Sequence, residues 1–191
     1  MFLYEIFNAH IQNKKINYKI HYIKTTESTN QYTWDSKSTI LKHGNIIITK
    51  NQTSGVGRRG TKWLSSKNKS LTFSLVIKEY QKYDHLLSLK TGLSIVEGIK
   101  KDTGINATLK WPNDIMLNNK KIGGILIEKK GRMIVIGVGI NVKENSNDLN
   151  PIIKKQSTSL KIISNLSISI ETLLANILNK FEQNYYEKNN E

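Results

Sequence analysis

The sequence contains no cysteine. This absence excludes disulfides, thiolate metal sites and cysteine nucleophiles. Long apolar runs are also missing, since none approaches the ~20 residues of a membrane-spanning helix. The N-terminal Met1-Phe2-Leu3-Tyr4-Glu5 lacks the basic and apolar regions of a signal peptide. We therefore expect a cytoplasmic protein without membrane contact.

Acidic residues are few, with 15 Asp and Glu against 29 Lys and Arg, and the formal net charge is +14. Such an excess is typical of proteins that bind nucleic acid or another polyanion. The lysines are scattered in ones and twos, however, and form no basic tail. ATP or an acidic protein substrate would account for the charge equally well. A basic nucleic-acid-binding module with exposed aromatics at Tyr185 and Tyr186 is the non-enzymatic alternative.

The length of 191 residues fits one domain with a substantial core. Apolar patterning predicts strands at residues 21–23, 45–49, 70–77, 114–117, 121–128 and 133–142. Helical spacing predicts two long amphipathic helices, one after residue 84 and one over 170–186. We predict an α+β fold in which a mixed β-sheet with hairpins has flanking helices. A single domain over 21–187 would follow a lead-in of uncertain structure over 1–20.

Several local features carry sharper expectations. Ser28-Thr29-Asn30 supply three good N-cap residues for a helix, and residues 70–77 are expected to form a half-buried central strand. Asn118-Asn119 predicts a tight hairpin, because asparagine tolerates left-handed backbone. Trp63 and Trp111 are expected in or just below the core. In the first long helix, with a candidate N-cap at Asp84, the predicted apolar stripe is formed by Leu86, Leu89, Leu93 and Val96.

The end of the chain has weaker patterning. Residues 143–165 are polar and poorly periodic, which predicts a long loop. Residues 187–191 are expected to fray.

Three short motifs carry most of the chemical information. They are Gly55-Val56-Gly57-Arg58-Arg59-Gly60, Lys110-Trp111-Pro112-Asn113-Asp114 and Lys121-Ile122-Gly123-Gly124-Ile125-Leu126. The glycine-rich loop lets backbone approach a ligand and adds two permanent positive charges, which suits phosphate. It matches neither the P-loop nor the dinucleotide fingerprint. The two lysines stand at the entrances of strand-like segments, so the motifs together predict a site for an activated carboxylate.

In this combination and order, the motifs resemble the catalytic domain of biotin protein ligases, which attach biotin to lysines of carrier proteins. The similarity runs across most of residues 21–142. It is carried by Ser28-Thr29-Asn30, Gln52, Gly55 to Gly60 with Trp63, Lys110 to Asp114, Lys121 to Leu126, and Gly137-Val138-Gly139-Ile140-Asn141. The terminal helix also resembles the end of that catalytic core.

The resemblance implies a reaction in two steps. Biotin's carboxylate attacks the α-phosphate of ATP to give biotinyl-5'-AMP and pyrophosphate, and a lysine of a biotin carboxyl carrier domain of a carboxylase then takes the biotin. ATP and Mg²⁺ are the implied cofactors, and no DNA partner is expected. A homodimer through an exposed sheet edge would fit the fold, although no residue pattern decides it.

The resemblance also assigns the site residues. Lys110 and Arg58 are the implied catalytic residues. Biotin would be bound by Ser28, Thr29, Asn30, Gln52, Gly55, Val56, Gly57, Arg58, Lys121, Gly123, Gly124, Gly137 and Gly139. ATP would be bound by Arg58, Arg59, Trp63, Lys110, Asn113 and Asn141, and no residue is assigned as a direct metal ligand.

The sequence departs from the family pattern in several places. Val56 and Thr61 stand where basic residues are usual, so two charges that would clamp the adenylate are absent. Only about twenty residues precede the core, so we expect no DNA-binding helix-turn-helix, and the chain ends where many relatives continue into a β-barrel.

The related octanoyltransferases need a nucleophilic cysteine, which this sequence lacks. A lipoate ligase, or another acyl-adenylate-forming ligase of the same fold, is the enzymatic alternative.

Overall fold

The computed structural model describes residues 1–12, 15–36, 40–78, 86–152 and 154–186. The strands are β1 (Lys19–Ile23), β2 (Asn45–Thr49), β3 (Gly55–Val56), β4 (Lys62–Trp63), β5 (Ser70–Lys78), β6 (Thr108–Lys110), β7 (Asp114–Leu117), β8 (Lys120–Lys130) and β9 (Met133–Asn141). The helices are α1 (Tyr4–His10), α2 (Thr29–Asp35), the 3-10 turn η1 (Arg58–Gly60), α3 (Leu87–Thr103), α4 (Leu160–Ser164) and α5 (Ile170–Tyr186).

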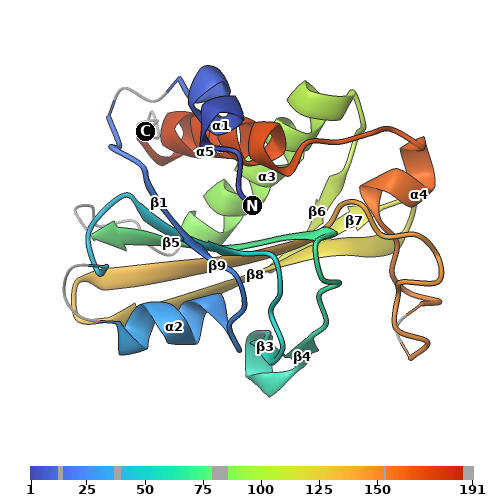
Figure 1. Ribbon diagram of the computed structural model, residues 1–191, viewed down its shortest axis with the longest axis horizontal. Coiled ribbons are helices and arrows are strands. Elements are labelled where there is room, and N and C mark those ends of the chain that lie inside the picture. Colours follow the sequence, from blue (N-terminus) through green and yellow to red (C-terminus); the bar gives the residue numbers. More distant parts are fainter. Residues whose placement is uncertain (13–14, 37–39, 79–85, 153, 187–191) are drawn as a thin grey trace.

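Seven strands form one mixed sheet in the order β1-β2-β5-β9-β8-β7-β6. The pair β1–β2 is parallel and the other pairs are antiparallel. Helices α1, α3 and α5 lie on one side of the sheet, whereas α2 and the small β3–β4 hairpin lie on the other (Figure 1). The predicted α+β fold is therefore confirmed.

Strand β5 is buried along almost its whole length, from Ser70 to Ile77. The prediction of a half-buried strand is wrong, because α2 contacts β5 on the face opposite the main helical layer. Ser70, Thr72 and Ser74 therefore point into protein rather than into solvent. Because these three residues alternate along β5, their hydroxyl groups make one buried face of the strand polar.

Helix α3 exists as predicted but buries a different face. Leu89 and Leu93 are 47% and 43% exposed. The buried face includes Ile95, Gly98 and Ile99 and packs on α5. A Cβ at Gly98 would stand 2.7 Å from Ile177 Cγ1, so the close approach of α5 selects the glycine face over the leucine stripe. Asp84, the predicted N-cap, lies outside the described residues.

The N-terminal segment is more ordered than its sequence suggests. It contains α1, whose Phe7 is buried, and it follows α5 closely. Gln12 N donates to Asn179 Oδ1 at 2.7 Å, and Ile16 N donates to Glu182 Oε2 at 2.7 Å. Because these partners lie on α5, the structure of the lead-in depends on residues far along the chain.

The predicted hairpin and the predicted helix cap are confirmed, and of the three candidate cap residues the structure uses Ser28. Ser28 accepts from Gln31 N at the start of α2, and Asn118 and Asn119 adopt φ of 48° and 60° between β7 and β8. The prediction of a loop over 143–165 is wrong at α4, which forms a short helix. The predicted fraying of 187–191 falls outside the described residues.

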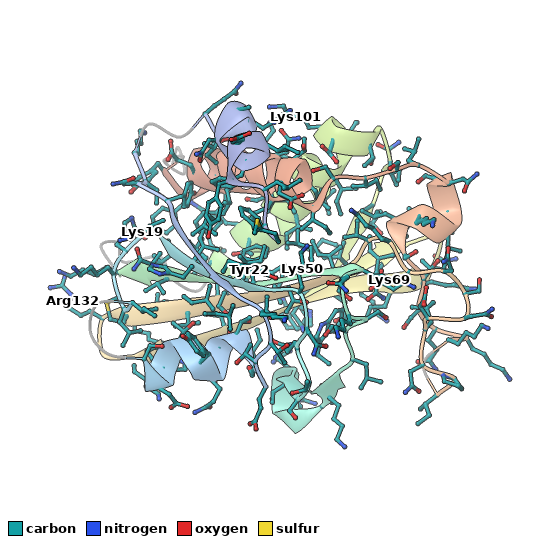
Figure 2. All side chains as sticks on the ribbon, in the orientation of Figure 1. Lys19, Tyr22, Lys50, Lys69, Lys101 and Arg132 are labelled. Carbon is teal, nitrogen blue, oxygen red and sulfur yellow. The ribbon has the colours of Figure 1, made fainter. Side chains whose placement is uncertain are left out.

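One of the two aromatics on which the nucleic-acid alternative depends is not at the surface. Tyr185, predicted to be exposed, is buried and stacks on Phe181 with ring centroids 5.5 Å apart. Of the basic residues labelled in Figure 2, Lys19 lies on the left of the molecule, Lys101 at the top and Lys69 on the right. Within the described part of the chain, no helix is long and apolar enough to cross a membrane.

Candidate active site

A cavity of about 290 Å³ opens on the sheet face that carries α2 and the β3–β4 hairpin. The start of α2, the glycine-arginine loop and strands β5 and β7 to β9 all contribute to its walls. Of the predicted site residues, it is lined by Ser28, Thr29, Asn30, Gln52, Val56, Gly57, Arg58, Trp63, Asn113, Lys121, Gly124, Gly137 and Gly139. The fold thus brings the separate motifs to one place.

The remaining predicted residues do not line the cavity. Arg59 and Lys110 are exposed. Gly55 and Gly123 are packed behind the lining, where a Cβ would meet Trp63 O at 2.6 Å or Gly139 O at 2.9 Å. Asn141 is buried and donates from Nδ2 to Thr158 O at 3.0 Å, so it holds the segment after β9.

A chain of hydrogen-bonding side chains forms the floor of the cavity. Gln52 Oε1 accepts from Thr29 N at 2.9 Å, and Ser74 Oγ lies 2.7 Å from Thr29 Oγ1 and 2.6 Å from Asn30 Oδ1. Asn30 Nδ2 in turn donates to Glu128 Oε2 at 2.7 Å. Such a connected chain fixes the orientation of Thr29, Asn30 and Gln52 toward a ligand.

Sequence reasoning missed Ser74 and Glu128. For Ser74 a signal was present, because a serine interrupts the apolar stretch at the end of β5. Glu128 offered no such signal, since its partners Asn30 and Trp34 lie on α2.

Two of the glycines make room for side chains of the protein itself. A Cβ at Gly137 would lie 2.4 Å from Asn30 Oδ1, and one at Gly139 would lie 2.3 Å from Trp63 Cε2. Gly124 is different, because its nearest neighbour, Lys121, is at 3.6 Å. Gly124 therefore leaves space in the cavity that a ligand can use.

Two buried polar atoms in the cavity wall have no partner among the described residues, Trp63 Nε1 and Thr72 Oγ1. Leaving such a group unsatisfied costs about 1–3 kcal/mol. A ligand that accepts from the indole N–H and bonds to the hydroxyl would remove this cost. This part of the cavity wall is therefore suited to binding a polar group of a ligand.

The opposite side of the cavity is cationic. Lys121 Nζ forms an ion pair with Asp114 Oδ1 at 2.6 Å, and both side chains are about one third exposed, at 36% and 30%. Lys110 is the register partner of Asp114 across β6 and β7, and Arg58 is exposed at the rim. An anionic ligand would compete with Asp114 for Lys121.

The two departures from the family pattern also face the cavity. Val56 is 52% exposed, and Thr61 Oγ1 donates to Arg58 O at 2.9 Å within the loop. Neither side chain carries a charge, so the positive charge of this loop comes from Arg58 and Arg59.

A carboxylate cluster that could hold a metal ion, with three or more His, Asp or Glu side chains, is absent from the described residues.

Trp111 is 82% exposed, so the prediction of a core or subsurface position is wrong. It begins the turn between β6 and β7, and β6 is the outermost strand of the sheet. The turn projects beyond the core, and this placement leaves the indole in solvent.

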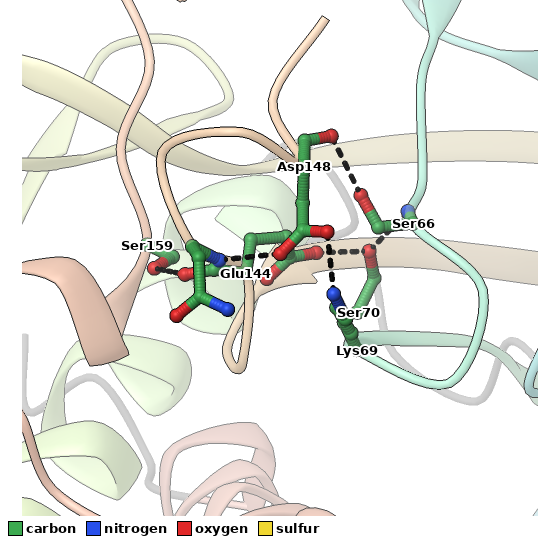
Figure 3. Close-up of polar contacts among 7 residues, drawn as sticks. Ser66, Lys69, Ser70, Glu144, Asp148 and Ser159 are labelled. Carbon is green, nitrogen blue, oxygen red and sulfur yellow. Dashed lines mark hydrogen bonds and ion pairs between the residues drawn. The ribbon is translucent and has the colours of Figure 1, made fainter.

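A second polar cluster joins the segment that leads into β5 to the segment that follows β9 (Figure 3). Glu144 is fully buried, accepts from Ser70 Oγ, and leaves Oε2 without a partner. Burial raises the pKa of Glu144, which the hydrogen bond from Ser70 only partly offsets. Nearby, Lys69 pairs with Asp148, and this hydrogen bond lowers the pKa of Asp148.

These opposite pKa shifts predict opposite pH dependences of stability. Because the pKa of Glu144 is raised in the folded state, its contribution falls as pH rises from the ordinary value through the raised one. Asp148 has a lowered pKa, so its contribution is lost as pH falls through the ordinary value toward the lowered one.

We therefore expect Glu144→Gln to flatten the loss of stability on the alkaline side of the ordinary carboxyl pKa. Asp148→Asn should instead flatten the loss on its acidic side. Urea unfolding at a series of pH values measures both effects. If the stability of both variants changed with pH in the same way, the opposite pKa shifts of Glu144 and Asp148 would be contradicted.

Comparison with known proteins gives a consistent result. The model of the biotin/lipoate A/B protein ligase family matches residues 22–145. The bifunctional ligase/repressor BirA of Bacillus spizizenii is 35% identical over 150 residues, which cover 74% of this chain and 46% of that protein. BirA of Escherichia coli is 38% identical over 123 residues, which cover 61% of this chain and 38% of that protein. The chain thus spans less than half the length of these curated relatives.

Among solved structures, the biotin protein ligase of Aquifex aeolicus in complex with biotin and ATP superimposes with a TM-score of 0.78 at 30% identity. The match covers 86% of this chain and 69% of that one. The family match begins within β1 and extends past the end of β9. This chain therefore belongs to the biotin/lipoate A/B protein ligase family.

Proposed function

We propose that this protein uses ATP to activate biotin as biotinyl-5'-AMP and transfers the biotinyl group to a lysine of a biotin carboxyl carrier domain. The observation that carries the proposal is the two-sided cavity. A hydrogen-bonding floor around Thr29 and Gln52 faces a cationic side with Lys121 and Arg58. The solved relative from Aquifex aeolicus, bound to biotin and ATP, supports the same pairing of ligands.

In the first step, biotin would lie between these two sides. Its ureido ring needs both donors and acceptors, and Ser28, Thr29 and Gln52 supply them at the floor. Asn30 is held by Ser74 and Glu128 and keeps that floor in place. Biotin's carboxylate would replace Asp114 as the partner of Lys121 and so point toward the rim.

The nucleotide would lie at that rim. A carboxylate oxygen attacks the α-phosphorus, the bond to the β-phosphate oxygen breaks, and pyrophosphate leaves with the electron pair. Negative charge grows on the phosphate oxygens, which Lys110 and Arg58 would stabilise. Arg59, Trp63 and Asn113 are the proposed further contacts, whereas Asn141 would act by positioning the segment around Thr158. Mg²⁺ would enter bound to ATP and offset phosphate charge.

In the second step, the acceptor's uncharged lysine amine attacks the biotinyl carbonyl carbon. The bond to the AMP oxygen breaks, AMP leaves with that electron pair, and the amine loses a proton as the amide forms. The cavity is about 290 Å³ and Arg58 in its lining is exposed, so the side chain of an incoming lysine would enter past this residue.

The complete reaction can be tested with the whole chain, ATP, Mg²⁺, biotin and a carrier domain from an acetyl-CoA carboxylase. We expect mass spectrometry to show one biotinyl group on a single acceptor lysine, and omission of ATP to abolish it. A carrier domain with that lysine replaced by arginine is the matched control. Biotin-independent modification, or none with wild-type acceptor, would contradict the proposal.

A further inference from the structure

The most exposed tryptophan of the molecule's described part lies beside the cavity but outside it. Trp111 is 82% exposed and does not line the cavity, whereas Asn113, two residues later, does. Trp63 also lines the cavity, with its ring against Gly139. Trp63 therefore supplies an aromatic side chain to the cavity, whereas the side chain of Trp111 is exposed to solvent outside it.

The turn that carries Trp111 is fixed on two sides. Pro112 O accepts from Ser88 Oγ on α3 at 2.8 Å. Asn113 Nδ2 donates to Ile125 O at 3.2 Å, and Ile125 N donates to Asn113 O at 3.0 Å. Because α3 and β8 both hold the turn, its backbone loses little freedom when Trp111 meets a partner. A rigidly presented tryptophan is the side-chain type most enriched at interface hot spots.

The charge around this tryptophan indicates the kind of partner. Arg58, Lys62 and Lys110 are exposed cations on this rim or directly beside it. Asp114 is the acidic residue among those described as lining the cavity, and it is paired with Lys121. The rim thus has excess positive charge and favours a partner with an acidic surface.

We propose that Trp111 anchors an acidic, folded acceptor domain while that domain presents its target lysine to the cavity. The proposal rests on the proposed function, because transfer to a protein lysine requires a protein surface to meet this rim. Trp111 would contact the acceptor and not the nucleotide. Trp111 would therefore contribute to binding of the acceptor domain and not to formation of the adenylate.

The experiment compares the whole wild-type chain with Trp111→Ala and Trp111→Phe. Binding of an unmodified carrier domain from an acetyl-CoA carboxylase is measured by calorimetry, and adenylate formation is measured separately without acceptor. Leu3→Ala is the control, because Leu3 is also exposed, at 49%, and precedes α1 on the α5 layer. We expect Trp111→Ala to weaken acceptor binding about tenfold or more, as for an interface hot spot. Trp111→Phe should lose less, and adenylate formation should stay within about twofold of wild type.

Two other results would contradict the proposed role of Trp111. An acceptor affinity of Trp111→Ala equal to that of wild type would overturn the proposal. A loss of adenylate formation as large as the loss of acceptor affinity would also overturn it, because Trp111 would then act in ATP binding or in folding. If wild type forms no biotinyl-adenylate, the proposed function fails. The calorimetric comparison still decides whether Trp111 docks the acidic domain.

Discussion

Lys110→Ala and Arg58→Ala are each expected to lower the rate of biotinyl-adenylate formation by about 10²-fold or more while leaving the fold intact. The magnitude is that of removing one preorganised group that stabilises charge in a transition state. The fold should survive because both side chains are exposed and neither contributes to the core. Surface substitutions of this kind usually change stability by less than about 0.5 kcal/mol.

The measurement is biotin-dependent exchange of pyrophosphate into ATP, combined with a thermal melt of each variant without ligand. Lys101→Ala is a matched control, since Lys101 is also exposed but lies in the last turn of α3 at the top of the molecule (Figure 2) and does not line the cavity. Unfolding of Lys110→Ala or Arg58→Ala would contradict the placement of these charges. Exchange at the wild-type rate would remove them from the mechanism.

Gly124→Val is expected to weaken biotin binding by about 10- to 100-fold, as an overpacking cost of about 1–3 kcal/mol would produce. The first added carbon has room, because its nearest neighbours, Lys121 and Trp63, are at 3.6 Å and 3.8 Å. The two further methyl groups have to occupy the cavity itself. The strand conformation of β8 accommodates valine readily, so folding should be preserved.

Calorimetric titration with biotin measures this effect, and Gly124→Ala provides the graded control. Alanine adds only the carbon that makes ordinary contacts, so its effect on affinity should be small. A biotin affinity in Gly124→Val equal to that of wild type would mean that biotin lies elsewhere. Gly137→Ala is not equivalent, because its added carbon would collide with Asn30 Oδ1 at 2.4 Å.

Features set by neighbours in sequence were predictable. The strand at residues 45–49, the hairpin at Asn118-Asn119 and the helix cap at Ser28 depend on local propensity and backbone preference. The resemblance carried by the motifs also indicated which residues would gather at one site. Most of the predicted binding residues accordingly line one cavity.

Features set by distant partners were not predictable. The buried face of α3 is chosen by the fit of Gly98 against Ile177, which outweighs the leucine spacing. Helix α1 is ordered by groups on α5, and the floor of the cavity depends on Glu128, which reaches Asn30 from β8. Exposure of Trp111 likewise follows from the position of β6 at the edge of the sheet.

The most direct test of the proposed activity is the release of pyrophosphate from ATP and Mg²⁺ with biotin, with lipoate or with no acid, read together with mass spectrometry of the acyl-adenylate. The two-sided cavity predicts release with biotin alone and accumulation of biotinyl-5'-AMP. Release with lipoate instead of biotin, or no release with either acid, would contradict the assignment.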